Sequence, residues 1–236
     1  MSTDKVAIII PALNEESALR HLLPEIPPTA AQWIIVADNG STDATIAVAH
    51  AAGAIIASEP TRGYGRNCLT GFKKACSLGA DIVIFMDGDG SDDPADLPMM
   101  LAPLLEERAD LVMGSRVSTR SERGAVPPQA RLGNWLVCRM IHILYGVRLS
   151  DIGSFRVIRC SSLEKLHMSE MTFGWPVEMV VKSAKAGYRI VELPIHYRHR
   201  SHGRSKVAGT IVGSAKAAYY MLRTTLRYAG AKGRHA

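Results

Sequence analysis

The chain has 236 residues, of which 47% are hydrophobic and 21% are charged. This composition excludes a disordered protein and fits one large α/β domain, or one domain with an appendage. No run of about 18 apolar residues occurs, and the amino terminus lacks the pattern of a signal peptide, so we expect a cytoplasmic protein without a transmembrane helix. The four cysteines show no metal-ligand spacing, which predicts reduced, partly buried thiols.

The net charge of +6 hides a strong asymmetry along the chain. Residues 1–115 hold 7 Lys and Arg against 16 Asp and Glu, whereas residues 182–236 hold 12 against 1. An acidic half that holds a metal ion, facing a basic half, suits a phosphate-bearing substrate between them. The basic part could instead contact anionic lipid or nucleic acid, or be a solvated helix face.

The first strand is expected at residues 5–10 and stops at Pro11. A helix capped by Asn14 should follow, with Glu15 and Glu16 favouring its positive end. The loop between them would lie at the carboxyl edge of the sheet, where a nucleotide base could bind.

A second strand at residues 33–37 ends at Asp38, whose carboxylate could accept hydrogen bonds from a base or ribose. A helix over residues 42–52 and a short strand at 54–57 complete this part, with Gly53 at the end of the helix.

Residues 61–80 place three glycines around Arg62 and Arg66, ahead of a helix. The spacing is not a dinucleotide fingerprint. Two guanidiniums on a glycine-rich loop that leads into a helix could bind a diphosphate, although this signal is weak alone.

Residues 82–86 form an unbroken apolar run that ends in Asp87-Gly88-Asp89. The run predicts a strand buried on both faces of a parallel sheet, and ligands bind beyond the carboxyl ends of such strands. Two carboxylates on a short loop suit Mg²⁺ or Mn²⁺ shared with substrate phosphates. The alternative is an acidic turn after a core strand.

A helix over residues 96–108 and a strand at 109–114, ending near Arg116, continue the regular alternation of strands and helices. This alternation predicts an α/β fold with a mostly parallel central sheet and right-handed crossovers. We assign 1–116 to a nucleotide-binding half and 117–206 to an acceptor half.

The second half starts with a polar loop, residues 117–131, which is predicted to be a mobile lid. Residues 132–145 predict an apolar helix that is either part of the core or a surface helix dipping into lipid. A strand at 155–158 and a helix at 175–186 follow.

Two further strands are predicted at residues 189–193 and 195–200. His196, His199 and His202 are spaced by three in an extended segment with Arg between them, so a zinc site is not expected. The basic loop 201–206 suits an anion.

Residues 207–236 predict a C-terminal amphipathic helix, over 207–228, and a basic tail. Lys216 and Arg223 break its apolar stretch, which argues against a helix that spans a bilayer.

In chain order, the segments PALNEE, VADNGSTDAT, TRGYGRNCLTGFKKA, MDGDG, MGSR, DIGSFR and HRSHGRSK resemble the motifs of family 2 glycosyltransferases. The resemblance covers roughly residues 5–206 and is greatest to dolichyl-phosphate mannose synthases and bacterial polyprenyl-phosphate sugar transferases. It implies a GT-A fold and an inverting hexosyl transfer from a UDP- or GDP-sugar to a polyprenyl phosphate, with Mg²⁺ or Mn²⁺. It also implies that the helix at 132–145 lies at the membrane interface, in a protein peripheral to the cytoplasmic membrane face.

The resemblance assigns roles by motif. The donor would be bound by Pro11, Leu13, Glu15, Asp38, Asp87, Gly88, Asp89 and Ser205, together with the Arg66 of the glycine-rich loop. The metal would be held by Asp87, Asp89 and Ser91, and the catalytic groups would be Asp89, Arg116, Asp151, Arg200 and Lys206.

The expected reaction is direct displacement at the anomeric carbon. A phosphate acceptor is already ionised and needs no strong base, whereas a soluble hydroxyl acceptor would need a carboxylate, for which Asp151 or Glu178 is the candidate.

Two other classes compete with this prediction. One is a sugar nucleotidyltransferase, although the loop after the first strand lacks its basic signature. The other is a non-catalytic nucleotide-sugar binding module. Nucleic acid is not an expected partner because the basic part has few aromatic residues for stacking. A homodimer through the apolar C-terminal helices is a further hypothesis.

Overall fold

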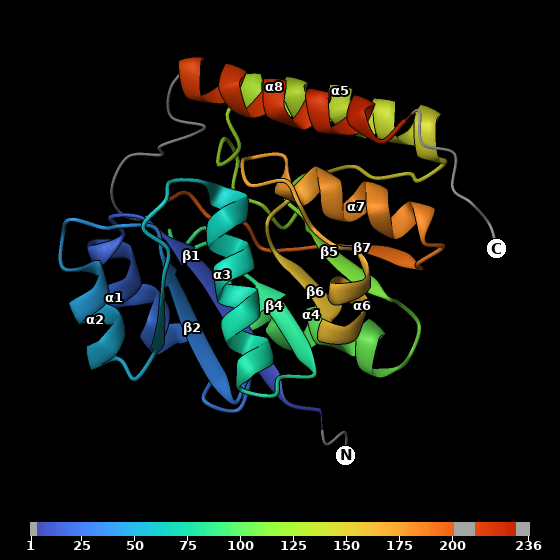
Figure 1. Cartoon of the computed structure of the whole chain (residues 1–236). Coiled ribbons are helices and arrows are strands. Elements are labelled where there is room, and N and C mark those ends of the chain that lie inside the picture. Colours follow the sequence, from blue (N-terminus) through green and yellow to red (C-terminus); the bar gives the residue numbers. More distant parts are fainter. Residues whose placement is uncertain (1–3, 201–210, 230–236) are drawn as a thin grey trace.

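The computed structural model describes residues 4–200 and 211–229. A seven-stranded sheet of order β3-β2-β1-β4-β6-β5-β7 crosses the molecule, with helices on both of its faces (Figure 1). The strands are β1 (Val6–Ala12), β2 (Trp33–Asp38), β3 (Ile55–Ser58), β4 (Ile82–Phe85), β5 (Leu111–Ser115), β6 (Arg156–Arg159) and β7 (Ile190–Pro194).

Strand direction decides which loops meet. The neighbours β1–β2, β2–β3, β1–β4 and β5–β7 are parallel, whereas β6 runs antiparallel between β4 and β5. The sheet is therefore mostly parallel, as predicted. The carboxyl ends of β1, β2, β4 and β5 and the amino end of β6 share one edge, and polar loops from distant parts of the chain converge there.

The helices are α1 (Glu16–Glu25), α2 (Thr45–Ala51), α3 (Tyr64–Ser77), α4 (Leu97–Leu105), α5 (Pro128–Tyr145), α6 (Cys160–Lys165), α7 (Trp175–Lys185) and α8 (Ile211–Arg227), with a 3₁₀ turn, η1 (Pro94–Asp96), ahead of α4. One face of the sheet packs against α1, α2 and α4. The other face packs against α3, α5 and α7, and α8 adds partly buried side chains to that side.

Strand β4 shows why this part of the sequence is apolar without alternation. Ile82 and Ile84 belong to the core under α1 and α4, whereas Val83 and Phe85 belong to the core under α3 and α7. Successive side chains of a strand point to opposite faces, so a strand covered on both sides must be apolar throughout. The predicted central strand is confirmed.

Several predicted elements differ from the structure. Residues 195–200 do not form a strand; they make an isolated bridge, between Tyr197 and Asp92, that lies outside the seven strands of the sheet. Asn14 does not cap α1; it adopts a positive φ of 50°, and its side chain accepts a hydrogen bond from Thr42 N. Helix α5 begins at Pro128, four residues earlier than predicted, and α6 was not predicted.

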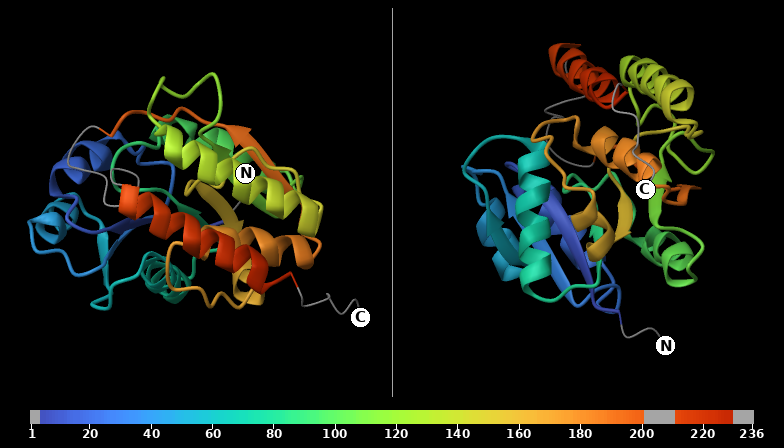
Figure 2. Two further views of the ribbon diagram at one scale, coloured as in Figure 1. Left: turned by 90° about the horizontal axis from the view of Figure 1, so that it is seen from above. Right: turned by 45° about the vertical axis from the view of Figure 1, so that its right-hand side comes forward.

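Helices α5 and α8 lie side by side above α7, as both views show (Figure 2). The hydroxyl of Tyr145 on α5 donates to the Thr225 carbonyl on α8 at 2.6 Å. The Cβ of Ala218 on α8 lies 3.7 Å from the position that a Cβ on Gly133 would take. The predicted amphipathic C-terminal helix is thus packed onto α5 and α7. None of the described helices is long and apolar enough to cross a membrane.

Candidate active site

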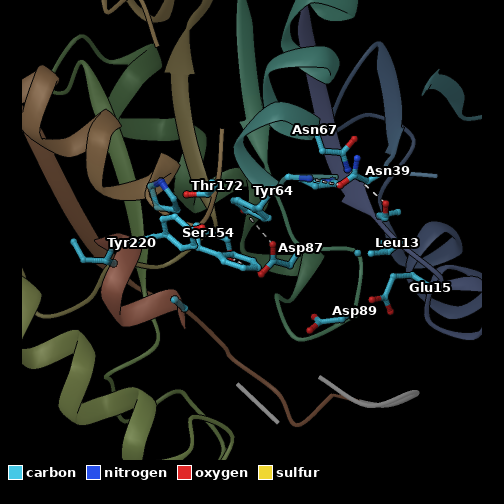
Figure 3. A pocket seen from close by; sticks show the side chains of 18 of the residues that line it. Leu13, Glu15, Asn39, Tyr64, Asn67, Asp87, Asp89, Ser154, Thr172 and Tyr220 are labelled. Atoms are coloured by element: carbon cyan, nitrogen blue, oxygen red, sulfur yellow. Dashed lines mark hydrogen bonds between the residues drawn. The ribbon is translucent and has the colours of Figure 1, made fainter. Parts of the chain in front are cut away.

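A cleft of about 560 Å³ opens at the carboxyl edge of the sheet. Its floor comes from the loops after β1 and β4, one side comes from the glycine-rich segment before and within α3, and the other side comes from residues 172–176 and α8 (Figure 3). The predicted site residues that line it are Pro11, Leu13, Glu15, Asp87, Gly88, Asp89, Arg116 and Arg200. The ends of β1 and β4 therefore bring together the residues on which the sequence prediction depended.

Asp87 is the most constrained of these acids. Its carboxylate accepts a hydrogen bond from Ser154 Oγ at 2.6 Å and a longer one from the Tyr64 hydroxyl at 3.4 Å. Burial, reinforced by the negative charge of Asp89, raises the pKa of Asp87 to about 6. An acid held in this way is poised to bind a cation, because a cation would offset both effects.

Asp92 adds a second buried carboxylate directly beneath Asp87. Its side chain is 0% exposed, one oxygen accepts a hydrogen bond from Asp87 N at 3.1 Å, and the other oxygen has no partner among the described residues. Burial and the neighbouring Asp87 raise the pKa of Asp92 well above its usual range. Asp92 thus fixes the backbone of the acidic loop and adds to its negative potential.

Asp89 and Glu15 both lie close to the guanidinium of one arginine, Arg200. The guanidinium of Arg200 contacts Glu15 and lies 3.5 Å from the Asp89 carboxylate. Asp89 also accepts a hydrogen bond from the backbone N–H of Ser91 at 3.0 Å. Arg200, which directly precedes the basic loop 201–206, therefore lies in the cleft against the acids.

Arg116 lies at the end of β5 and is paired with Asp151. Two hydrogen bonds of 2.7 and 2.8 Å join its guanidinium to that carboxylate, and the Arg116 backbone N–H donates to it as well. Burial alone would raise the pKa of Asp151, but the guanidinium holds that pKa below its usual range. The arginine lines the cleft while the carboxylate behind it, 1% exposed, fixes its position.

The structure places Asp38, which was predicted to bind the base, outside the wall of the described cleft. The side chain is 3% exposed and absent from the cleft wall, and its carboxylate accepts hydrogen bonds from the backbone N–H groups of Gly40 and Ser41. Asn39 lines the cleft instead and bonds to Glu59 O, Thr61 O and Gly63 N, so it ties the glycine-rich segment to the end of β2.

The start of α3 is closed by protein carbonyls. The backbone N–H groups of Gly65 and Arg66 donate to Thr172 O and Met171 O. Glycine is required here, since a Cβ on Gly65 would lie 2.2 Å from a carbonyl oxygen of the same segment. These two backbone donors are therefore not available to a diphosphate.

The position of Arg66 does not match its predicted role in binding the donor. The Arg66 side chain is not among the described residues that line the cleft. Burial raises the pKa of Glu59, but its hydrogen-bond partners and then the charge of Arg66 lower that pKa below its usual value. Arg62 lines the cleft in its place and donates to Gly40 O at 3.1 Å.

Comparison with known proteins decides the family. The model of Glycosyl transferase family 2 matches residues 7–167. A glycosyltransferase of Mycobacterium tuberculosis that carries no assigned reaction is 38% identical over 215 residues, which cover 91% of this chain and 94% of the relative. The undecaprenyl-phosphate mannosyltransferase of Micrococcus luteus is 30% identical over 222 residues, covering 89% and 90%. The chain belongs to glycosyl transferase family 2.

The solved structures agree on the fold of this glycosyltransferase. The glucosyl-3-phosphoglycerate synthase of Mycobacterium tuberculosis, solved with Mn²⁺, UDP and glucosyl-3-phosphoglycerate, superposes with a TM-score of 0.71 at 21% identity, covering 97% of this chain and 81% of that one. A second mycobacterial protein gives a TM-score of 0.74 at 23% identity, covering 97% and 76%. The α/β sheet with its flanking helices is thus the GT-A fold that the sequence predicted.

The acidic loop of the glycosyltransferase fits a divalent cation. Asp87 and Asp89 are oxygen donors on one short loop, and a cation bound there would offset the burial and the Asp89 charge that raise the pKa of Asp87. Among residues 4–200 and 211–229, no group of three or more His, Cys, Asp or Glu could hold a metal ion. The remaining ligands would come from a donor diphosphate and water, as is usual for Mg²⁺.

Ser91 does not fit the predicted metal role. Its side chain is 3% exposed and is not among the described residues of the cleft wall. Ser205, Lys206 and His202 lie outside the described residues. His196 bonds to Asp96, and the ring of His199 bonds to a backbone carbonyl, so neither faces a metal.

The two candidate bases, Asp151 and Glu178, each form an ion pair inside the protein. Asp151 is paired with Arg116, as described above. Glu178, 0% exposed, accepts hydrogen bonds from the Ser169 and Glu170 backbone N–H groups and from the Tyr228 hydroxyl, and it pairs with Lys182 at 2.8 Å. The prediction that either could deprotonate an acceptor hydroxyl is therefore wrong.

Several cleft residues were missed by the sequence analysis. They are Tyr64, Asn67, Ser154, Thr172, Phe173, Tyr197, Lys216 and Tyr220. Asn67 is 2% exposed and donates to Ala37 O at 2.7 Å, which fixes the end of β2. Ser154 lay inside the DIGSFR motif, but only the antiparallel direction of β6 reveals that it meets Asp87.

We expect Glu178→Gln to lower the free energy of unfolding at pH 7 by about 2 kcal/mol, because the substitution weakens charged hydrogen bonds. Despite its burial, the bonds from Lys182 and Tyr228 hold the pKa of Glu178 below its usual value. The stability that its charge provides is therefore present above the unfolded pKa and lost as the pH falls through the folded one.

Urea unfolding between pH 7 and pH 3 measures this effect. The stability difference between the native protein and the Glu178→Gln variant should shrink as the pH falls below about 4.5. A difference that stays constant over the whole range would contradict a charged Glu178 in the folded state.

Proposed function

We propose that this glycosyltransferase moves a hexose, with inversion, from a UDP- or GDP-sugar to a polyprenyl phosphate at a membrane surface. Asp87 and Asp89 would hold Mg²⁺ or Mn²⁺ against the donor diphosphate. The bound metal would supply positive charge for the departing nucleoside diphosphate. Arg200 and Arg116 supply further charge from the protein.

The observation that carries the acceptor assignment is the lack of a spare base in the described cleft. The acids on its wall are Glu15, Asp87 and Asp89. Glu15 is paired with Arg200, while the two aspartates form the cation site. A hydroxyl acceptor must lose a proton to a base, whereas a phosphate oxygen is already ionised at neutral pH. A phosphate acceptor therefore suits the groups present.

The names of two relatives support the same acceptor class. The Micrococcus luteus relative is an undecaprenyl-phosphate mannosyltransferase. A Methanococcus voltae relative, 25% identical over 242 residues and covering 90% of this chain, is a dolichyl-phosphate N-acetylglucosaminyltransferase. Both names specify a polyprenyl phosphate, although their sugars differ.

The α5–α8 face supports contact with a membrane. Its exposed apolar side chains are Leu132, Trp135, Leu136, Ile143, Leu144, Tyr219 and Leu226, with exposed fractions between 41% and 68%. Arg131, Arg139 and Arg227 are exposed on the same two helices. Apolar side chains bordered by arginine are the pattern of a surface that lies in the interface of an anionic membrane. We therefore place the protein at the cytoplasmic membrane face as a peripheral enzyme.

Different parts of the cleft would bind different parts of the donor. Leu13 and Asn39 line the end of the cleft away from α8 and suit the nucleoside, while Asp87 and Asp89 lie between that end and Tyr220 (Figure 3). The anomeric carbon would lie above the acids. Arg200, already 3.5 Å from Asp89, is placed to stabilise charge on the leaving diphosphate.

A transfer assay tests this function. Purified protein, Mg²⁺ or Mn²⁺, labelled UDP- and GDP-sugars and a short polyprenyl phosphate should give metal-dependent label in the butanol phase. Asp89→Asn should lower the rate at least about 100-fold, because a carboxylate that holds transition-state charge is lost. Asp93→Asn, on the same loop but bonded to Arg198 and outside the described cleft wall, is the matched control and should retain activity.

Metal-dependent donor hydrolysis without label in butanol would move the assignment to a soluble hydroxyl acceptor. Nucleotide-sugar binding with neither activity would favour the non-catalytic binding module. Full activity of Asp89→Asn would contradict the metal site.

A second experiment tests the membrane contact. The double variant Trp135→Ser and Ile143→Ser removes two side chains that are 61% and 68% exposed, and it should lower binding to anionic vesicles at least about tenfold. Ile46→Ser on α2, 40% exposed and away from the α5–α8 pair, is the control (Figure 1). Co-sedimentation with vesicles is the measurement, and equal binding of both variants would contradict the proposed face.

A further inference from the structure

One wall of the cleft is made by α8, which the sequence analysis did not connect with the site. Lys216, Ala217, Tyr220 and Met221 line it. Positions three and four residues apart share a helix face, as 217 and 220, 216 and 220, and 217 and 221 do, so a single stripe of α8 points into the cleft. In Figure 3 Tyr220 lies on the opposite side of Asp87 from Asn39 and Leu13. The cleft thus runs from the proposed nucleoside end, past the acids, to α8.

Lys216 differs from the other cations of the cleft. Arg116 is paired with Asp151, Arg200 with Glu15, and Arg62 donates to a backbone carbonyl. Lys216 is exposed, and its ammonium has no hydrogen bond or ion pair with any residue that the structure describes. It therefore brings an uncompensated positive charge to the α8 end of the cleft.

The surroundings of this charge are apolar. Phe173 and Pro176 line the cleft together with Ala217 and Met221 of α8. A small polar acceptor would leave this surface unused, because polar ligands bind where several donors and acceptors converge. A molecule with one anionic group and an apolar chain matches both parts of the wall.

An aromatic pair joins this end of the cleft to the outer face of α8. The rings of Tyr219 and Tyr220 lie 5.5 Å apart between centroids, at an interplanar angle of 69°. Tyr220 lines the cleft, whereas Tyr219 is 61% exposed on the face that we assign to the membrane. The pair therefore joins the α8 wall of the cleft to the exposed face of α8.

We propose that Lys216 binds the phosphate of the acceptor and that the Tyr219–Tyr220 pair binds the first isoprene units of its chain. This proposal rests on the proposed function and deepens it, because it places the acceptor on α8 and brings its phosphate toward the acids from the side opposite the nucleoside. Lys216 acts by binding an anion through one charge-assisted contact. It takes no part in the bonds that are made and broken.

Initial rates in detergent micelles, where the surface charge of a membrane is absent, test the role of Lys216. Lys216→Ala should raise the KM for polyprenyl phosphate about tenfold, the change expected for one charged hydrogen bond. The KM for the donor and the rate of donor hydrolysis should be unchanged. Arg223→Ala is the matched control, since Arg223 is exposed two turns further along α8 but is not among the described residues of the cleft wall.

The outcomes separate the proposals. An acceptor KM raised by Lys216→Ala alone supports the site. Equal increases in both variants, or no increase in either, overturn it while the proposed function stands, because the native protein still forms lipid-linked product. No product from the native protein overturns the proposed function, and this site with it.

Inhibition distinguishes a lipid phosphate from a free phosphate. Farnesyl phosphate should compete with the acceptor at a concentration at least about tenfold lower than inorganic phosphate, because burial of each CH₂ group adds to affinity. Tyr219→Ser should reduce that advantage and leave inhibition by inorganic phosphate unchanged. Equal inhibition by the two ligands in the native protein would overturn the part assigned to the aromatic pair.

Discussion

The burial of negative charge at the end of β4 is the constraint on which the site depends. Asp87 follows directly from a strand that is apolar on both faces, and its carboxylate lies where water is scarce, so its pKa is raised to about 6. Asp92 beneath it is 0% exposed. Two such carboxylates repel each other, and the structure compensates them only in part, with hydroxyl donors from Tyr64 and Ser154. A cation is the partner that this arrangement lacks.

Because the strands are mostly parallel, this charge lies where several loops meet. The end of β1 brings Leu13 and Glu15, the segment before α3 brings Arg62, and the end of β5 brings Arg116. Strand β6 runs in the opposite direction, so its amino end supplies Ser154 to the same place. Catalytic and binding groups from residues far apart in the chain therefore surround one edge of the sheet.

The two ends of the cleft are physically connected. Residues 169–173 accept hydrogen bonds from the start of α3 and contribute Thr172 to the cleft. The Glu170 carboxylate accepts hydrogen bonds from Thr172 and from Thr224 on α8. The helix proposed to bind the acceptor and the glycine-rich segment near the donor thus share one support.

The acidic loop and the positions of most strands along the chain could be predicted, because buried strands leave long apolar runs and their ends carry polar residues. Asp87, Asp89, Glu15 and Arg200 were placed by these signals together with the family motifs. The antiparallel direction of β6 was not encoded in any local pattern, so the meeting of Ser154 with Asp87 was missed.

The errors share a physical cause. The carboxylates of Asp38 and Asp151 resemble ligand-binding groups in sequence, but burial obliges each of them to satisfy protein donors. The role of Lys216 depends on which face of α8 meets the cleft, and this packing is set by α5 and α7, which lie far from it in sequence.

The most direct test of the central claim is a titration of Mn²⁺ followed by electron paramagnetic resonance, which reports the free ion. The two carboxylates of the acidic loop cannot complete a coordination shell alone, so the account predicts weak binding by the protein and binding at least about tenfold tighter when UDP or GDP is added. Asp89→Asn should abolish the gain from the nucleotide. Tight Mn²⁺ binding that is independent of nucleotide, or a gain that survives Asp89→Asn, would contradict a cation shared between the acidic loop and the donor diphosphate.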